Sequence, residues 1–365
     1  MSDAPSDIPQ RKLEHIEITA RQPVTGSTAA GWADIRLLHA CLPEVDKDAI
    51  DLSVEFLGRR LRAPLIIAGM TGGHPQAAAI NATLARAVEA FGLGMGVGSQ
   101  RAALRSPALM STYTVAREHA PTALLMGNVG LPQLIDQPNQ PALTLAELER
   151  AVEAIRADAL VVHLNYLQEV VQPEGETRAR GALAALARLC AALSVPVVAK
   201  ETGAGMTRQQ AERLRDAGVR ALDVGGAGGT SFALVEAQRA RARGKPLSER
   251  LGQLFAGWGI PTAVSVVETA GLGLPVIATG GIRSGLDAAK ALALGATVVG
   301  VAQPALSAAL EGDEALHRWL EGFLEELRVA LFLTGSPDIA TLRRQPRIIL
   351  GETRAWLRQL GHPIP

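Results

Sequence analysis

Asp223-Val-Gly-Gly-Ala-Gly-Gly-Thr-Ser231 is the segment that says most about this chain, because an apolar run ends there in four closely spaced glycines and two hydroxyls. Glycine-rich breaks also follow other apolar runs, at residues 68–73, 96–101, 127–130, 201–205 and 279–285. One such cluster is weak evidence, since any tight turn can need glycines. Repeated bare backbone indicates loops that share a flat or phosphorylated ligand.

Short apolar runs of the buried parallel-strand type alternate with amphipathic helical segments. The runs cover residues 64–68, 93–97, 123–126, 159–164, 196–199, 221–224, 275–278 and 297–302, and the helices 81–91, 144–157, 179–192, 207–217, 285–294 and 310–333. Thr144 and Thr207 each precede Glu or Gln by three residues, the pattern of a capping box. Eight such units predict an α/β fold of the (β/α)8 TIM-barrel type. An open doubly wound sheet is the alternative, although no complete G-x-G-x-x-G or G-x-x-x-x-G-K-[ST] motif occurs.

The chain of 365 residues is longer than the roughly 250 that a barrel requires. We therefore expect an N-terminal extension over residues 1–61, the barrel over 62–310 and a helical section of the same domain over 311–365. Trp319 and Trp356 are expected to anchor that last section by packing. No low-complexity linker separates the parts, so one domain is predicted.

The amino-acid composition excludes several classes of protein as explanations for this chain. The chain is 48% hydrophobic and has 36 basic and 36 acidic residues, so it lacks the positive charge of a nucleic-acid binder. Two cysteines exclude a disulfide framework and fit a reducing cytosol. Residues 1–10 lack the apolar core of a signal peptide. The apolar stretch 291–310 is interrupted by glycines, Gln303 and Pro304, so two helix pieces and a strand explain it better than a membrane span. We expect a soluble, cytoplasmic protein.

In such barrels the active site lies at the carboxyl ends of the strands, where all of these loops fall. Thr279-Gly-Gly-Ile-Arg-Ser-Gly285 follows the seventh run and opens a helix, so its amides and Arg283 predict a phosphate cup. A plain turn is the alternative interpretation.

Polar side chains crowd two further strand ends. His163 to Glu169 holds imidazole, amide and carboxylate groups after the fourth run, and buried groups of this kind need polar partners such as a ligand or a metal. Lys200 closes the fifth run. It is a Schiff-base nucleophile, a cation beside an anionic cofactor, or an ion-pair partner of Glu201, and the sequence leaves these three open.

Hydrogen-bond donors suited to an oxyanion end the second and third runs, at Ser99, Arg101 and Asn128. Arg11 and Lys12 stand beside an acid and an imidazole near the N-terminus. This charged run is either a solvated face, which is its usual meaning, or an arm that reaches over the barrel mouth.

Together these motifs resemble those of the type II isopentenyl-diphosphate isomerases, FMN-dependent enzymes on a (β/α)8 barrel, over nearly the whole chain. The motifs are Arg11-Lys-x-Glu-His15, Met70-Thr-Gly-Gly73, Gly98-Ser-Gln-Arg101, Gly127-Asn-Val-Gly130, His163-Leu-Asn165 with Gln168-Glu169, Lys200-Glu-x-Gly203, the glycine run 225–229 and Gly280-Gly-Ile-Arg283.

The resemblance implies roles for individual residues. FMN would be bound by Gly69, Met70, Thr71, Ser99, Asn128, Lys200, Thr230, Gly280, Gly281, Ile282, Arg283, Ala302 and Gln303. The substrate diphosphate would be bound by Arg11, Lys12, Ser99, Gln100, Arg101, His163, Asn165 and Gln168. Mg²⁺ would be held by Glu169, and Gln168 would lie close to the reacting carbons. Gln168, His163 and Lys200 would be the catalytic residues.

The implied reaction interconverts isopentenyl and dimethylallyl diphosphate, a step of isoprenoid biosynthesis, by a 1,3 proton shift with reduced FMN as acid and base. The family is commonly reduced by NADPH and tends toward tetramers and octamers. An unactivated alkene must be protonated at carbon, and no strand end offers a convincing pair of carboxylates for that task. A cofactor that performs the proton chemistry removes this difficulty.

The alternatives share the barrel. FMN-dependent α-hydroxy-acid oxidases carry a His and an Arg after the sixth strand, where this chain has only glycine, alanine and hydroxyls. Purine-nucleotide dehydrogenases and reductases need a Cys in that loop, and Cys41 and Cys190 lie elsewhere. A non-catalytic flavin protein would have no use for Arg11, Arg101 and Glu169 together. The isomerase is therefore the favoured hypothesis.

Overall fold

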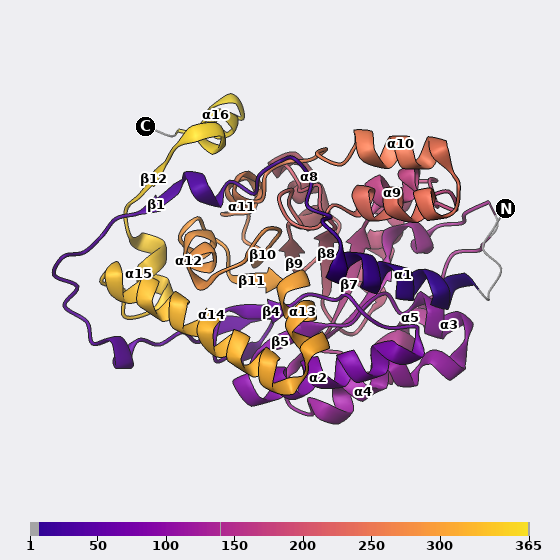
Figure 1. The fold of residues 1–365 in the computed structure, drawn as a ribbon, viewed down its shortest axis with the longest axis horizontal. Coiled ribbons are helices and arrows are strands. Elements are labelled where there is room, and N and C mark those ends of the chain that lie inside the picture. The colour runs from indigo at the N-terminus through magenta and orange to yellow at the C-terminus, as the bar shows by residue number, and fades with distance from the viewer. Residues whose placement is uncertain (1–6, 139, 364–365) are drawn as a thin grey trace.

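A computed structural model describes residues 7–138 and 140–363 of the chain, and its centre is a closed barrel of eight parallel strands in chain order (Figure 1). The strands are β4 (Leu65–Ile67), β5 (Gly94–Gly96), β6 (Leu124–Gly130), β7 (Ala159–Leu164), β8 (Val197–Glu201), β9 (Ala221–Asp223), β10 (Val276–Thr279) and β11 (Val298–Val301). β11 pairs with β4 and closes the ring. The (β/α)8 fold and all eight strand positions are confirmed.

The strands are short and buried, and their alignment places polar residues in one row. His163 lies opposite Lys200 across β7 and β8, and Lys200 lies opposite Asp223 across β8 and β9. Because neighbouring parallel strands run in register, residues that end successive strands meet at the same edge of the barrel. That edge is where the sequence predicts the site.

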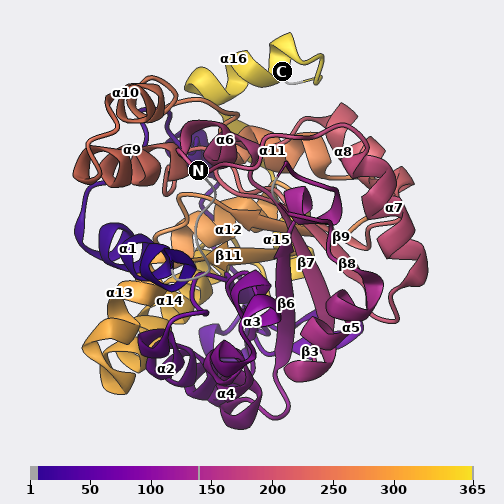
Figure 2. The same ribbon diagram turned by 90° about the vertical axis from the view of Figure 1, so that its right-hand side faces the viewer.

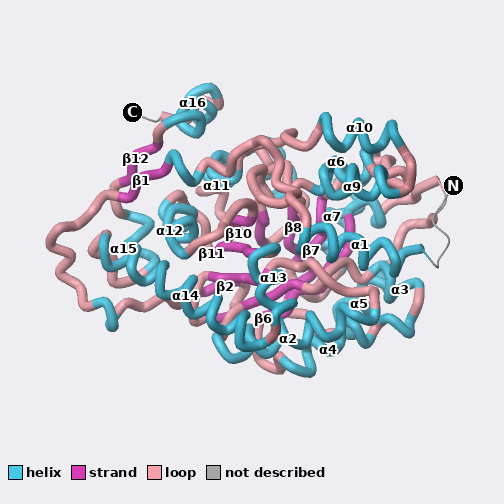
Figure 3. The backbone as a smooth tube through the Cα atoms, viewed as in Figure 1, coloured by secondary structure: helices cyan, strands magenta, loops and turns pink. Residues whose placement is uncertain are grey.

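Helices surround the barrel (Figures 2 and 3). They are α1 (Asp7–Arg21), α2 (Pro75–Phe91), α3 (Arg101–Arg105), α4 (Ser111–His119), α5 (Leu145–Ala154), α6 (Tyr166–Val171), α7 (Ala182–Ala192), α8 (Arg208–Asp216), α9 (Phe232–Ala242), α10 (Pro246–Leu254), α11 (Thr262–Thr269), α12 (Gly285–Ala293), α13 (Gln303–Glu311), α14 (Asp313–Leu333), α15 (Ile339–Arg344) and α16 (Gly351–Gln359). Short 3-10 turns cover Trp32–Asp34, Lys47–Ala49, Pro107–Leu109 and Leu131–Leu134.

The predicted helices are all present, and the Thr144 capping box forms with both of its hydrogen bonds. The hydroxyl of Thr207 accepts the N–H of Gln210 at 3.4 Å. The segment predicted as one helix over 310–333 is two helices, because Gly312 at φ +114° ends α13. A left-handed φ of this kind suits glycine and breaks a helix.

The amino ends of the barrel strands are covered by a hairpin, β2 (Val54–Phe56) and β3 (Arg59–Leu61). Phe56 is 1% and Leu61 2% exposed, and both pack against the apolar side chains that begin the strands, such as Ile66 and Leu124. The N-terminal extension thus closes one end of the barrel with apolar surface, which leaves the carboxyl end for ligands.

A short strand after the first helix and one near the end of the described chain pair outside the barrel. β1 (Ile35–Leu37) pairs antiparallel with β12 (Arg347–Ile349), next to α16 at the upper left of Figure 1. Trp319 packs against Phe323 with ring centroids 5.3 Å apart, as expected of an anchor. The expectation for Trp356 was wrong, since this side chain is 39% exposed. Within the described residues, no helix has the length and apolarity needed to cross a membrane.

Candidate active site

A cavity of about 440 Å³ opens at the carboxyl ends of the strands, with α1 at its rim. It brings together nearly all of the residues that the sequence singled out. Those that line it are Arg11, Lys12, Gly69, Met70, Ser99, Arg101, Asn128, His163, Asn165, Gln168, Glu169, Lys200, Thr230, Gly280, Gly281, Ile282, Arg283, Ala302 and Gln303. The N-terminal run is therefore part of the site and not a solvated face.

Two of the expected residues lie behind the cavity wall. The Thr71 side chain is 1% exposed and its hydroxyl bonds Asn81. Gln100 is fully buried, donates to the Ala151 carbonyl at 2.8 Å and accepts the N–H of Asn128 at 3.0 Å. Both side chains hold the loops in place, so neither is available to a ligand here.

One wall of the cavity is made mostly of backbone. This wall, the glycine side, consists of Gly69, Gly225, Gly226, Gly229, Gly280 and Gly281. A Cβ on Gly229 would come within 2.8 Å of the Gly281 nitrogen, and one on Gly280 within 2.4 Å of the Gly226 oxygen. These approaches exclude side chains and leave peptide groups facing the cavity, as a flat ring requires.

Unused hydrogen-bond donors gather at the glycine side. α13 begins at the cavity after Ala302, and no side chain caps its first N–H groups. The Thr279 hydroxyl is buried without a hydrogen-bond partner and its residue lines the same cavity. A helix N-terminus and a free hydroxyl are suited to a phosphate, so this wall fits a flavin mononucleotide.

Arg283 stands at the outer edge of the glycine side. Its guanidinium lies 3.3 Å from the Gly228 carbonyl oxygen and 3.5 Å from the Thr25 hydroxyl. Its side chain is exposed on the solvent side of the cup. A phosphate in the cup would contact the Arg283 guanidinium on its outer side and backbone N–H groups on its inner side.

Lys200 pairs with Asp223, at 2.7 Å, and not with Glu201. Asp223 is the residue that opens the glycine-rich run and lies opposite Lys200 in the strand register. Glu201 instead accepts the N–H groups of Gly203 and Gly205, at 2.7 and 3.1 Å, which holds that loop. Burial raises the pKa of Glu201 to about 7.

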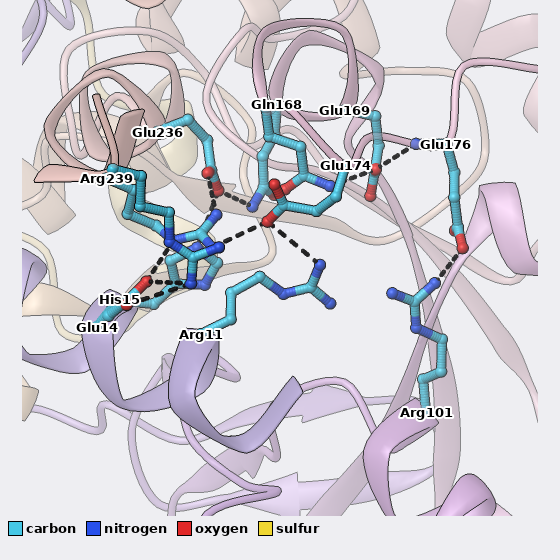
Figure 4. A network of polar contacts seen from close by, with 12 residues as sticks. Arg11, Glu14, His15, Arg101, Gln168, Glu169, Glu174, Glu176, Glu236 and Arg239 are labelled. Atoms are coloured by element: carbon cyan, nitrogen blue, oxygen red, sulfur yellow. Dashed lines mark hydrogen bonds and ion pairs between the residues drawn. The ribbon is translucent and has the colours of Figure 1, made fainter. Parts of the chain in front are cut away.

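The opposite wall, the ionic side, is made of charged and imidazole side chains, Arg11, Lys12, Arg101, His163 and Glu169. Figure 4 shows Arg11, Arg101 and Glu169 among them. Glu176 forms a buried ion pair with Arg101. Glu174 lies 3.8 Å from Arg11. Each arginine thus has a carboxylate from the same loop.

Burial and neighbouring cations lower the basicity of this wall. Burial, then Arg11 and Arg101, lowers the pKa of Lys12 to about 7. Burial, then Lys12 and Arg101, lowers the pKa of His163 to about 3, so its imidazole is neutral. Its Nδ1 lies 2.7 Å from Oδ1 of Asn128. An anionic ligand would relieve this crowding of positive charge.

Glu169 is 5% exposed and sits at the end of the ionic side. Its oxygens accept from Asn165 at 2.8 Å, Gln172 at 2.7 Å and the backbone of Glu176 at 2.8 Å. Burial raises its pKa, and this effect outweighs the hydrogen bond from the Glu176 N–H, which lowers it. Oδ1 of Asn165 has no partner although it is buried.

A metal at this place would have few protein ligands. In the part of the chain that the structure describes, no three His, Cys, Asp or Glu residues converge to hold an ion. Mg²⁺ is often bound by one or two carboxylates and otherwise by phosphate oxygens and water. Glu169 and the unpaired Asn165 oxygen fit an ion of that kind.

Sequence reasoning missed four charged residues that organise the ionic side: Glu174, Glu176, Glu236 and Arg239. Glu174 and Glu176 follow the polar segment His163 to Glu169 within a few residues, so a signal lay close by. Glu236 and Arg239 lie on α9, a helix whose polarity is spread around its axis and which gave no periodic pattern.

The chain has clear relatives. A model of the FMN-dependent dehydrogenase family matches residues 4–165 and 165–348. An isopentenyl-diphosphate delta-isomerase of Methanosarcina barkeri is 48% identical over 356 residues, which cover 97% of this chain and 96% of the relative. The enzyme of the same name from Methanoregula boonei is 51% identical over 356 residues, with 97% of each chain covered.

Solved structures of similar shape are more distant in sequence. A lactate oxidase described from Pediococcus acidilactici has a TM-score of 0.66 at 16% identity and covers 96% of each chain. A mandelate oxidase variant with a monooxide FMN adduct has a TM-score of 0.61 at 20% identity, covering 92% of this chain and 95% of that one. At this identity the likeness supports the barrel fold alone.

Proposed function

The chain belongs to the type II isopentenyl-diphosphate delta-isomerases within the FMN-dependent dehydrogenase family, and on that premise we propose that it interconverts isopentenyl and dimethylallyl diphosphate. One observation carries the proposal to this chain's own residues. Arg11, Lys12 and Arg101 converge with Glu169 on the wall that faces the glycine side. Such a set of cations beside one carboxylate matches a diphosphate with its metal.

FMN is proposed to lie along the glycine side, with its phosphate at Gly229, Gly280, Gly281, Thr279 and the start of α13. The reduced cofactor supplies the acid and base group for moving the double bond. Lys200, fixed by Asp223 at 2.7 Å, provides a positive charge at the barrel mouth. Its held position favours the cation role over a Schiff base, which needs a lysine free of such a partner.

The diphosphate is proposed to bind at the ionic side. Arg11 and Arg101 approach it as guanidinium groups and Lys12 as an ammonium, while neutral His163 contributes a hydrogen bond without charge. Glu169 and Asn165 would hold Mg²⁺, which would bind the diphosphate. Gln168 lies beside them on α6 and lines the same cavity, and it is proposed as a catalytic residue near the reacting carbons. These residues orient the substrate and exclude water from the flavin side.

Two further expectations belong to this proposal. NADPH is the proposed reductant, since the isomerisation itself has no net redox change and needs the flavin reduced once. A homo-oligomer, a tetramer or octamer, is expected from the family resemblance. Anaerobic bleaching of the flavin absorbance by NADPH tests the reductant. Gel filtration with light scattering tests the oligomeric state.

A direct assay tests the function. Purified protein with reduced FMN and Mg²⁺ should convert isopentenyl to dimethylallyl diphosphate. The products are identified after acid hydrolysis. Omission of Mg²⁺ or oxidation of the flavin should each stop turnover. If no dimethylallyl product forms while a 2-hydroxy acid is oxidised, the alternative α-hydroxy-acid oxidase replaces the isomerase.

A further inference from the structure

Helix α9 carries two buried charged residues that do not line the cavity. Glu236 is fully buried and Arg239 is 2% exposed. Ionised side chains are seldom buried this deeply unless they are paired. Their partners come from three separate segments of the chain, and two of these segments carry residues of the ionic side (Figure 4).

Arg239 joins those segments. Its Nε donates to Glu14 on α1 at 2.9 Å, and its Nη2 donates to Glu174, in the loop after α6, at 2.8 Å. Its third contact is an ion pair with Glu236 on α9 itself. One buried guanidinium therefore ties α1 to the loop whose other carboxylate, Glu176, pairs with Arg101.

Glu236 makes the second connection. Its Oε1 accepts the side-chain N–H of Gln168 at 2.8 Å and lies 2.8 Å from Nε2 of His15 on α1. Burial would raise the pKa of Glu236, but His15, Arg239 and Gln168 outweigh it and lower the pKa to about 2. Glu236 is thus an ionised acceptor shared by α1 and α6.

Both apolar and polar contacts join α1 to α9. Ile18, Val24 and Val235 form an apolar cluster with Phe232 and Leu234 against it, and the rings of His15 and Phe232 meet edge-on with centroids 6.0 Å apart. Ile16 joins the main core. The contacts of Glu14 and His15 to the α9 pair add buried polar links to the part of the helix that carries Arg11 and Lys12.

We propose that Glu236 and Arg239 are positioning residues that seat α1 at the barrel mouth, so that Arg11 and Lys12 face the diphosphate and Gln168 is aligned with them. The inference rests on the proposed function for the identity of the ligand. The seating of α1 itself does not depend on that identity, and it can be measured without turnover.

Glu14→Gln is the sharpest variant. It weakens the contacts of α1 with Arg239 and, at 3.3 Å, with Arg243 at the end of α9, but leaves Arg239 paired with Glu236 and Glu174. A charge-assisted hydrogen bond contributes enough that amide hydrogen exchange in residues 11–20 of the FMN-bound protein should quicken about tenfold. The KM for isopentenyl diphosphate should rise about tenfold in the assay, with kcat changed less than about twofold.

Arg241→Gln is the matched control. It removes a guanidinium charge from α9, as Arg239→Met does, but Arg241 has a 73% exposed side chain and lies 3.9 Å from Glu249. Exchange in α1 and both kinetic constants should match the unaltered protein. Arg239→Met removes the buried guanidinium itself and so extends the test. If that variant does not fold, Glu14→Gln still tests the contact between α1 and α9.

Each result has one meaning. Unchanged α1 exchange in Glu14→Gln overturns the seating of α1 by Arg239, whatever the activity. Faster exchange with an unchanged KM overturns the link from α1 to substrate binding. If the unaltered protein shows no isomerase activity, the proposed function fails, and the exchange comparison with Arg241→Gln still decides whether α9 seats α1.

Discussion

The glycine side and the ionic side face each other across one cavity but are built by opposite means. The first is peptide backbone, where a Cβ at Gly229 or Gly280 would collide with neighbouring atoms. The second is a set of polar and charged side chains, of which Arg11 and Arg101 are each held by a carboxylate of the loop after α6. Backbone amides suit a cofactor that stays bound, whereas charged side chains suit an anionic substrate that must enter and leave.

The difference predicts that the two walls can be damaged separately. Changes at the glycine side should weaken FMN binding and leave the substrate site intact. Changes at the ionic side should leave the flavin bound and impair substrate binding or turnover. A variant that violates this separation would show that the walls act as one unit.

The largest effect is expected at Glu169. Glu169→Gln removes the one carboxylate proposed to hold Mg²⁺, and a lost metal contribution of several kcal/mol should lower kcat/KM by roughly 10³-fold. The amide keeps the shape of the side chain, so the flavin spectrum and FMN affinity should not change. Steady-state assays across Mg²⁺ concentrations measure the effect, with Glu249→Gln on α10 as the control. Kinetics equal to those of the unaltered protein would remove Glu169 from the site.

A smaller effect on the other wall is expected from Gly229→Ala. The added methyl group would lie 2.8 Å from the Gly281 nitrogen, and overpacking of about 1–3 kcal/mol should weaken FMN binding roughly 10- to 100-fold. The KM for substrate, measured with FMN in excess, should stay constant. Flavin fluorescence titration of the apoprotein provides the affinity. Gly322→Ala is the control, because that position has open space around its Cβ. Equal FMN affinity in the two variants would contradict the phosphate position.

Thr279→Val tests the unpaired hydroxyl at the same wall. If the hydroxyl donates to the flavin phosphate, its loss should weaken FMN binding about 3- to 10-fold, the net value of one hydrogen bond. The apoprotein should keep or slightly gain thermal stability, because the buried hydroxyl has no partner to lose. Thermal melts with and without FMN separate the two effects. A variant with lower apoprotein stability and unaltered FMN affinity would assign the hydroxyl to the fold.

The smallest effect concerns pH. The pKa of Lys12 is lowered to about 7 by burial, Arg11 and Arg101, so the free protein carries this charge below pH 7 and loses it above. The KM for substrate should therefore rise a few-fold between pH 7 and 8.5. Lys12→Arg, whose guanidinium stays protonated, should flatten the rise. A slope that persists in Lys12→Arg would assign the titration to another group.

Much of the barrel could be predicted because its signals are local. A buried strand requires a short apolar run, and each run here ended in glycines or polar residues that mark the carboxyl edge. The hairpin that closes the opposite end carries Phe56 and Leu61 among charged residues, a pattern that did not stand out. The pairing of β1 with β12 joins segments about three hundred residues apart. The residues of neither strand identify the strand with which it pairs.

The site divides along the same line. Arg11, Lys12, Arg101 and Glu169 were recognised as motif residues, and the cavity brings them together. Thr71 and Gln100 were also recognised as motif residues, yet the loops turn their side chains into the wall. Side-chain direction depends on backbone angles and on neighbours from other strands, and no sequence spacing provides these.

The amino-acid order fixed the strands, the glycine side and the chemical groups available at the mouth, because these depend on neighbouring residues and on the absence of Cβ atoms. The pairing of charges was left to the folded chain. Arg239 meets Glu14 across 225 positions and Arg101 meets Glu176 across 75. A salt bridge leaves no periodicity in either partner's segment. Only the packing of separate segments at the barrel mouth, α1 with α9 and α3 with the loop after α6, selects which charges meet.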